Sequence, residues 1–283
     1  MKKHWIVIFI LFCFFLTEIL SGQDNTTEAK IFYYIGYEYF KKEEYAKGIE
    51  AFSNAINHDP QFAMAYEMRG HCYLCLLNFT VAIENYNQAL KLNPDDVAVT
   101  YWRGRAYHST KDFDKAIADY SYVIKQDPDF ESPYGHRVDI YITLGDYASA
   151  IADLDQVIRI EPDNANGYSS RGYLYILTED YDRAIMDFNR VMELDKEDVP
   201  AYINRGWSYY MKKEYDKAIL DYNEGLKLDP KNAYLFANRG IAYKDIGNYK
   251  QAIADLEECL RLEPDDEETA QLLEETRQLL GKK

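Results

Sequence analysis

The chain has 283 residues, of which 47% are hydrophobic and 28% are charged, as in an ordinary folded protein. Its formal net charge of −16 excludes the basic surface by which proteins bind nucleic acid or adhere to an anionic membrane through charge alone. We therefore expect no nucleic-acid partner and no direct membrane binding by the part of the chain that follows residue 22.

The first 22 residues have the layout of a secretory signal peptide. A basic start at residues 2–3 precedes a 12-residue apolar run over residues 5–16, and small residues follow at 21–22. An uncleaved membrane anchor is the alternative, although a helix needs about 20 residues to span a bilayer. We therefore expect an exported protein, in the periplasm, cell envelope or secretory pathway, with a polar linker over residues 23–28.

One pattern fills the chain from residue 29 to residue 264. Prolines recur at intervals of 34 residues or twice 34, and Lys196 occupies the one position where the series lacks a proline. With each proline taken as position 32 of a repeat, position 8 is Gly except for Val138, and position 11 is always Tyr. Position 20 is Gly or Ala, and position 24 is Phe, Tyr or Leu. The repeats are 29–62, 63–96, 97–130, 131–164, 165–198, 199–232 and 233–266.

This pattern resembles the tetratricopeptide repeat (TPR) family, in which each repeat is a pair of helices. Positions 4, 7, 8 and 11 share one face of a first helix, and positions 20, 24 and 27 share one face of a second. The resemblance implies an all-α fold, a right-handed α-solenoid of seven TPR helix–turn–helix repeats. Residues 265–283 predict a capping helix that covers the last repeat with one apolar side. That side is expected to carry Leu272, Leu273, Leu279 and Leu280.

Position 7 is Arg in every repeat after the first, which would suit a ladder of cations for an acidic ligand. Position 23, on the inward side of the second helix, is Asp or Asn wherever position 7 is Arg. In the first repeat both positions are apolar, Ile35 and Ala51. Because the two columns change together, we expect internal pairs such as Arg171 with Asp187 rather than a ligand site.

The sequence offers little for catalysis, since it has no glycine-rich phosphate loop and no nucleophile elbow. Cys72 and Cys75 form a CxxC pattern late in a first helix, where a thiolate is not stabilised, so both are interpreted as small apolar residues. His71, His108 and His136 lie in adjacent repeats without the i, i+3 or i, i+4 spacing of metal-binding helices. We expect no enzyme activity, catalytic residue, cofactor or metal; a metal enzyme or carrier built on these histidines is the alternative.

Two functional hypotheses then compete. In the first, the chain is a non-enzymatic scaffold or adaptor that binds a peptide or protein partner in the concave groove of a TPR superhelix. In the second, it is a membrane-tethered structural subunit of a cell-envelope or secretory-pathway complex and binds through its convex face or its ends. Substitution of groove residues would separate the two.

Positions 2, 6, 9 and 13 of the first helices, flanked by 5 and 12, point away from the packed side, and in similar proteins they line the groove. Aromatic residues gather at these positions towards both ends of the chain. They either pack neighbouring first helices together or serve as rigid anchors for a partner. The resemblance implies that the asparagines at position 6 of successive repeats hold the backbone of an extended peptide. The expected groove residues are Tyr33, Tyr37, Phe40, Tyr101, Trp102, Tyr173, Asn204, Trp207, Tyr210, Tyr234 and Asn238.

Other family members hold chaperone tails with a two-carboxylate clamp, which needs Lys at position 5 and Asn at position 9. In this chain the third repeat has Tyr101 and Arg105 at those positions, and the sixth has Ile203 and Trp207. We therefore expect that clamp to be absent.

Overall fold

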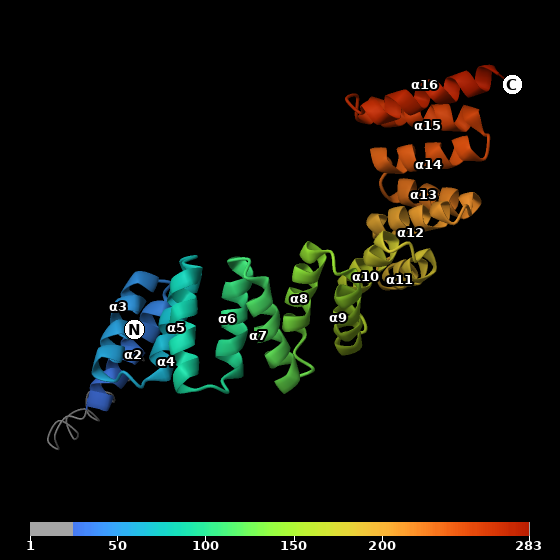
Figure 1. The fold of residues 1–283 in the computed structure, drawn as a ribbon. Coiled ribbons are helices and arrows are strands. Elements are labelled where there is room, and N and C mark those ends of the chain that lie inside the picture. The colour runs from blue at the N-terminus through green and yellow to red at the C-terminus, as the bar shows by residue number, and fades with distance from the viewer. Residues whose placement is uncertain (1–24, 283) are drawn as a thin grey trace, which may run out of the picture. The chain divides into compact units, whose positions relative to one another are not determined.

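The computed structural model describes residues 25–282, which form fifteen α-helices (Figure 1). The chain divides into two compact units, unit 1 up to Ile140 and unit 2 from Tyr141 onward. The expected signal peptide, residues 1–22, lies outside the described residues. The helices are α2 (Asn25–Lys41), α3 (Tyr45–His58), α4 (Ala63–Cys75), α5 (Phe79–Leu92), α6 (Val97–Ser109), α7 (Phe113–Gln126), α8 (Glu131–Leu144), α9 (Tyr147–Ile160), α10 (Ala165–Leu177), α11 (Tyr181–Leu194), α12 (Val199–Met211), α13 (Tyr215–Leu228), α14 (Ala233–Asp245), α15 (Tyr249–Leu262) and α16 (Glu267–Gly281).

The helices alternate between first and second helices of seven repeats, and each second helix begins 34 residues after the previous one, as the sequence predicts. The start of the first repeat differs from the prediction. Helix α2 begins at Asn25, so residues 25–28, expected to be part of a polar linker, are helical. Glu28 favours this extra turn because a carboxylate near a helix N-terminus is stabilised by the helix dipole. Its carboxylate also lies 2.9 Å from Nδ1 of His58 at the end of α3.

Glycine at position 8 lets an aromatic ring rest directly on the first helix. A Cβ atom added at Gly206 would lie 2.5 Å from a ring carbon of Tyr222, at position 24 of the same repeat. One added at Gly70 would lie 2.8 Å from the ring of Tyr86. Both distances are far shorter than the 3.5–4.0 Å of ordinary carbon contacts. The close crossing that the sequence predicts therefore depends on the pairing of position 8 with position 24.

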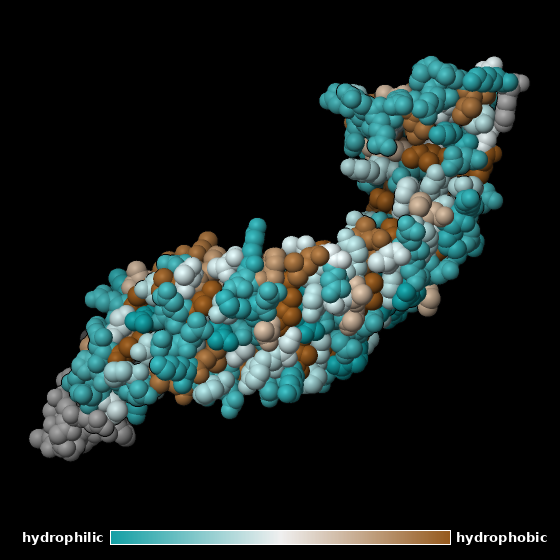
Figure 2. All heavy atoms as spheres, viewed as in Figure 1, coloured by the Kyte–Doolittle hydropathy of each residue, from teal (hydrophilic) through white to brown (hydrophobic). Residues whose placement is uncertain are grey.

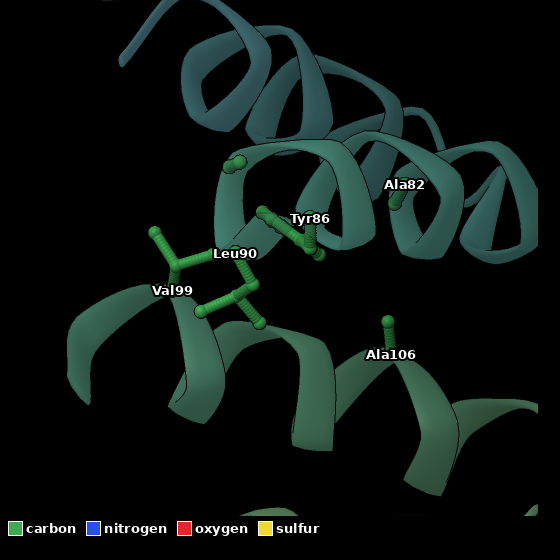
Figure 3. Close-up of a cluster of buried hydrophobic side chains, with 6 residues drawn as sticks. Ala82, Tyr86, Leu90, Val99 and Ala106 are labelled. Carbon is green, nitrogen blue, oxygen red and sulfur yellow. The ribbon is translucent and has the colours of Figure 1, made fainter. Parts of the chain in front are cut away.

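Neighbouring repeats join through positions 3 and 10 of the first helix. Val99 and Ala106 of α6 face Ala82, Tyr86 and Leu90 of α5 (Figure 3). Each of these five side chains is at most 8% exposed. The core of each unit is thus a series of small clusters, and neighbouring repeats share each cluster, as expected of a repeat protein.

Two backbone features end the helices of every repeat. Position 15, between the first and second helices, has a positive φ of 58° to 77° in all seven repeats, although only Gly145 and Gly247 are glycines. The second helix ends on a residue with an extended backbone, even where no proline follows. In that repeat Asp195 has a φ of −137°, and its carboxylate accepts a hydrogen bond from the backbone N–H of Glu197 (2.9 Å). An aspartate turn therefore stops the helix before Lys196 without a proline.

Helix α16 covers the last repeat, as the sequence predicts, but of the four leucines expected on its packed side only Leu273 is fully buried. Asp266 begins the helix by accepting a hydrogen bond from the backbone N–H of Thr269 (3.0 Å). The buried side chains are Thr269, Leu273 and Thr276, which follow the i, i+4, i+7 spacing of one helix face. Leu279, expected on the packed side, is 36% exposed. Two threonines therefore share this contact with Leu273, while Leu272 and Leu280 are partly buried beside it.

Hydrophilic residues cover most of the visible face of the molecule, and hydrophobic residues appear as smaller patches among them (Figure 2). None of the helices between residues 25 and 282 is both long enough and apolar enough to cross a bilayer.

Candidate partner-binding surface

We call the surface formed by positions 2, 5, 6, 9, 12 and 13 of the first helices the first-helix face. Consecutive first helices approach closely at three places, α2 with α4, α10 with α12, and α12 with α14. Among residues 25–282, no two consecutive second helices approach to the same extent. At these three places consecutive repeats therefore approach one another on the first-helix side.

In unit 1 the expected aromatic residues mainly pack against their own repeats. The Tyr33 ring centroid lies 5.7 Å from that of Phe52 and 5.1 Å from that of Phe62. Burial raises the pKa of the Tyr33 hydroxyl. Phe40 packs against Tyr45, with ring centroids 5.7 Å apart. These two side chains join helices together rather than standing free for a partner.

Tyr101 and Trp102 are also partly buried. The Tyr101 ring lies 5.1 Å from that of Phe130, and the Trp102 ring meets His71 edge-on at 5.0 Å. Of the residues expected in the groove of unit 1, Tyr37 is the most open to solvent, with 40% of its surface exposed. Packing between neighbouring helices, the alternative raised above, therefore accounts for most of this group.

Unit 2 presents its expected residues differently. Tyr173 of α10 is 51% exposed and Tyr234 of α14 is 67% exposed. Helix α12 contacts both α10 and α14. On α12, the Trp207 ring stacks on the Tyr210 ring with centroids 5.2 Å apart. The Tyr210 hydroxyl donates a hydrogen bond to the Asp245 carboxylate on α14 (2.7 Å). The stacked pair on α12 is thus tied to α14 through the Tyr210 hydroxyl.

Asn204 on α12 and Asn238 on α14 occupy the same position of neighbouring repeats. Both are partly buried, and neither carboxamide hydrogen-bonds to another residue within 25–282.

The first-helix face of the fifth and sixth repeats carries no charged side chain, although more than a quarter of the chain is charged. This uncharged surface consists of Asn166, Ser169, Ser170, Tyr173, Ile176, Leu177, Pro200, Ile203, Asn204, Trp207, Tyr210 and Met211.

The arginines at position 7 are internal, as the sequence predicts. Arg171 donates two hydrogen bonds to the Asp187 carboxylate, at 2.9 and 2.7 Å. It also donates to Asp155 of the preceding repeat at 2.6 Å. The hydrogen bond to Asp187 raises the pKa of Arg171, whereas burial raises the pKa of Asp187 against the opposing effect of the arginine. The guanidinium groups of these arginines are therefore bonded to side chains of the same chain.

The second hydrogen-bond partner of each arginine was not predicted from the sequence. It comes from position 25 of the preceding repeat, so each arginine joins two repeats as well as two helices. The sequence signal is a column of Ser, Asn and Asp directly after the aromatic column at position 24. The same double contact joins Arg69 to Asn85 and Ser53, Arg103 to Asp119 and Asn87, Arg205 to Asp221 and Asn189, and Arg239 to Asp255 and Asn223.

The histidines interact with tyrosines. Nδ1 of His71 lies 2.8 Å from the Tyr86 hydroxyl, and Nε2 of His136 lies 3.1 Å from the Tyr101 hydroxyl. Burial lowers the pKa of both His108 and His136. Over residues 25–282, no three His, Cys, Asp or Glu side chains are placed to hold a metal ion.

Comparison with protein families gives matches along most of the repeat region. Three models described as tetratricopeptide or TPR repeats match residues 73–129 and 178–233, residues 139–179, and residues 207–278. No curated protein matches the chain. Families of this kind are typically non-enzymatic and generally bind protein or peptide partners.

Solved structures share the fold at low identity. The C-terminal part of a TPR repeat-containing protein from Cytophaga hutchinsonii is 18% identical, with a TM-score of 0.72, and the match covers 84% of this chain and 98% of that one. YrrB, described as a TPR protein with an unusual peptide-binding site, is 20% identical with a TM-score of 0.58, over 67% of this chain and 98% of its own. MamA is 24% identical with a TM-score of 0.56, over 59% and 92%. With its 34-residue register, its helix pairs and these family matches, the chain is a tetratricopeptide repeat protein.

Proposed function

We propose that the chain is a non-enzymatic interaction scaffold that binds an extended peptide segment of a protein partner along α10, α12 and α14 of unit 2. The partner lies on the first-helix face, where Trp207 and Tyr210 provide a rigid aromatic platform. Tyr173 and Tyr234 cover the partner from either side. Aromatic side chains suit this role because they bury a large area and lose little conformational freedom.

The observation that carries the proposal is the pair of unbonded carboxamides on this surface. Asn204 and Asn238 recur at the same position of adjacent repeats, and each offers both a donor and an acceptor. An extended peptide exposes an unpaired N–H and C=O at every residue, which an amide side chain can match. The absence of charged side chains on the first-helix face of the fifth and sixth repeats, which includes Asn204, favours a partner segment that is uncharged where it crosses them. YrrB, which shares the fold, is itself described as having a peptide-binding site.

The test is capture of partners from the native compartment by the mature protein and by variants. Trp207→Ala combined with Asn204→Ala is expected to weaken partner binding at least tenfold while thermal stability changes little. Unchanged affinity, or loss of the fold together with binding, would contradict a role for this surface.

A second candidate, binding through the convex side, is favoured by one observation. Met186 on α11 and Leu220 on α13 occupy position 22 of successive repeats and are 68% and 60% exposed. Large apolar side chains in such positions often mark contact sites. The double variant Met186→Ser with Leu220→Ser is therefore the matched control for the groove variant. Loss of the partner in this control alone would assign binding to the convex side.

We also propose that the protein is exported and loses about the first 22 residues. The support is the order of features in that segment: a basic start, a short apolar run and two small residues. The intact mass of the native protein tests this proposal. A mass that includes Met1 and Lys2 would instead favour the uncleaved anchor and the membrane-tethered role.

A further inference from the structure

Arg105, at position 9 of the third repeat, stands apart from the other arginines. Its guanidinium lies over the Trp102 ring, 4.8 Å from the ring centroid. It makes no hydrogen bond or ion pair with any residue in the described range 25–282. Every other arginine in that range donates at least one hydrogen bond to another side chain. The first-helix face of unit 1 therefore carries one guanidinium whose N–H groups are available to a ligand.

A buried hydroxyl close to Arg105 also lacks a partner. Tyr120 has no exposed surface, and its hydroxyl makes no hydrogen bond in the described chain. The equivalent residue of the preceding repeat, Tyr86, directs its hydroxyl to Nδ1 of His71. His71 holds the position that Arg105 holds in the third repeat. By the same repeat geometry the Tyr120 hydroxyl lies on the side of Arg105, whose charge acts on it. The Tyr222 hydroxyl of the sixth repeat is also buried without a partner, but position 9 of that repeat is Trp207 and offers no cation beside it.

Further polar groups surround this hydroxyl. The His136 ring stacks on Tyr120 with centroids 5.4 Å apart and an angle of 23° between the planes. Its Nε2 lies 3.1 Å from the Tyr101 hydroxyl, and its ring lies 6.1 Å from that of His108. When Tyr101 donates to Nε2, the proton of the neutral imidazole lies on Nδ1, which is then a donor. Groups on α6, α7 and α8 that can donate hydrogen bonds thus lie near one another, and the charge of Arg105 acts on both Tyr120 and His136.

We propose that Arg105, Tyr120 and His136 form a binding site for a single carboxylate of a peptide lying along the first-helix face of unit 1. A carboxylate matches the planar fork of a guanidinium and accepts two parallel hydrogen bonds from it. Trp102 holds the guanidinium plane through a cation–π contact, so less freedom is lost on binding. The inference rests on the proposed function, because it takes a peptide as the ligand.

One acidic residue opposes this site. Asp139 is three residues after His136, and its negative charge acts on both His108 and His136. The Arg105 guanidinium itself is not paired with any carboxylate within residues 25–282. Asp139 instead lowers the affinity of the site for any anion, and a substitution that removes its charge is expected to tighten binding. The site also differs from the two-carboxylate clamp of the family, since position 9 is Arg rather than Asn.

The test uses the mature chain with ¹⁵N-labelled tryptophan side chains, followed by NMR. The probes are the blocked tripeptides acetyl-Gly-Glu-Gly-amide and acetyl-Gly-Gln-Gly-amide, and acetyl-Gly-Gln-Gly with a free C-terminus. A saturable shift of the Trp102 indole signal with either carboxylate-bearing peptide, but not with the neutral one, is the expected result. A response to the first probe identifies an acidic side chain as the ligand, and a response to the last identifies a C-terminal carboxylate.

The variants separate the site from general charge effects. Arg105→Gln is expected to lower the affinity for the carboxylate-bearing peptide at least tenfold, and Arg105→Lys to lower it less. Asp139→Asn is expected to raise that affinity. Arg261→Gln makes the same charge change on an exposed part of α15 and is expected to leave binding unchanged. Equal responses to the glutamate and glutamine peptides would overturn the proposal, as would an Arg105→Gln protein that is folded by circular dichroism and still binds.

The outcomes also separate this inference from the proposed function. Loss of partner capture in the Trp207 and Asn204 double variant, with no carboxylate response at Trp102, would remove the inference alone. If the Trp102 signal responds to the carboxylate but the unit 2 variants capture the partner normally, the carboxylate site is supported and the proposed binding surface of unit 2 is contradicted. A response at the Trp207 indole instead would place the carboxylate in the wrong unit and overturn the inference.

Discussion

Replacing Arg171 by Leu removes three hydrogen bonds at once, two to Asp187 and one to Asp155. Their contributions differ because the two carboxylates differ in exposure: the Asp187 side chain is 6% exposed and that of Asp155 is 47% exposed. Loss of the exposed contact costs about 0–1 kcal/mol. Loss of the buried one leaves an uncompensated charge and costs roughly 3–5 kcal/mol. We therefore expect Arg171→Leu to destabilise the fifth repeat by about 3–5 kcal/mol at neutral pH.

The pH dependence of the variant follows from Asp187. Burial already raises the pKa of this carboxyl in the folded protein, and removal of the arginine raises it further. A folded-state pKa above the unfolded value means that stability is lost as the pH rises through the folded pKa. The deficit of Arg171→Leu relative to the parent chain should therefore shrink as the pH falls from neutral and Asp187 becomes protonated in the folded state.

Hydrogen exchange of α10 and α11 is the appropriate assay, because a repeat protein need not unfold in one step. The double variant Arg171→Leu with Asp187→Leu is expected to recover much of the loss, since no buried charge remains. Arg183→Leu removes an exposed pair with Asp180 and is the control, and its effect is expected to be much smaller than that of Arg171→Leu. If the destabilisations caused by Arg171→Leu and by Asp187→Leu alone add up to that of the double variant, the two side chains are not coupled and the pairing energetics are refuted. A deficit that does not change with pH would refute them as well.

Other predictions follow from the turns, glycines and histidines. Gly206→Ala should destabilise the protein by about 1–3 kcal/mol in chemical denaturation, because its Cβ would lie 2.5 Å from a ring carbon. Gly135→Ala, whose Cβ would meet only a carboxylate oxygen at 3.8 Å, should instead stabilise α8 by about 1 kcal/mol, and an equal effect at the two glycines would contradict the crossing model. Leu77→Gly should raise the melting temperature, because Leu77 has a φ of 58° and a left-handed non-glycine residue costs about 1–2 kcal/mol. Because the pKa values of His108 and His136 are lowered, the unfolded state binds protons first, so unit 1 should lose stability as the pH falls below about 6.5; His136→Gln should reduce that slope in melts recorded from pH 7.5 to 5.

The sequence predicts most of the fold because each repeat imposes the same constraints. A small residue at position 8, an aromatic or leucine residue at position 24 and the Arg–Asp columns recur at fixed spacing, so one structural solution serves every repeat. The proline series, by contrast, is dispensable. Asp195 ends its helix through its own carboxylate, and Lys196 follows without disturbing the register.

The burial of Tyr33 and Tyr101 was harder to predict, because it depends on the loop between repeats. Tyr33 and Tyr101, both at position 5, are covered by Phe62 and Phe130, which stand at position 34 of the same repeats. Later repeats have Asp or Asn at position 34, so no ring is available there to cover the face. The concurrence of Tyr at position 5 with Phe at position 34 is a sequence signal for a packed tyrosine. A list of aromatic residues on one helix face cannot show this difference.

The three free cysteines within residues 25–282 are a set of internal reporters. Cys75 is exposed, while Cys72 in unit 1 and Cys259 in unit 2 are buried. Burial raises the pKa of Cys72 to about 12, so this thiol does not react while its repeat is closed. An alkylating reagent would therefore modify Cys75 at once and the other two only as fast as local opening exposes them. The alkylation rates at Cys72 and Cys259, read by peptide mass spectrometry, would measure how often each unit opens, without any engineered label.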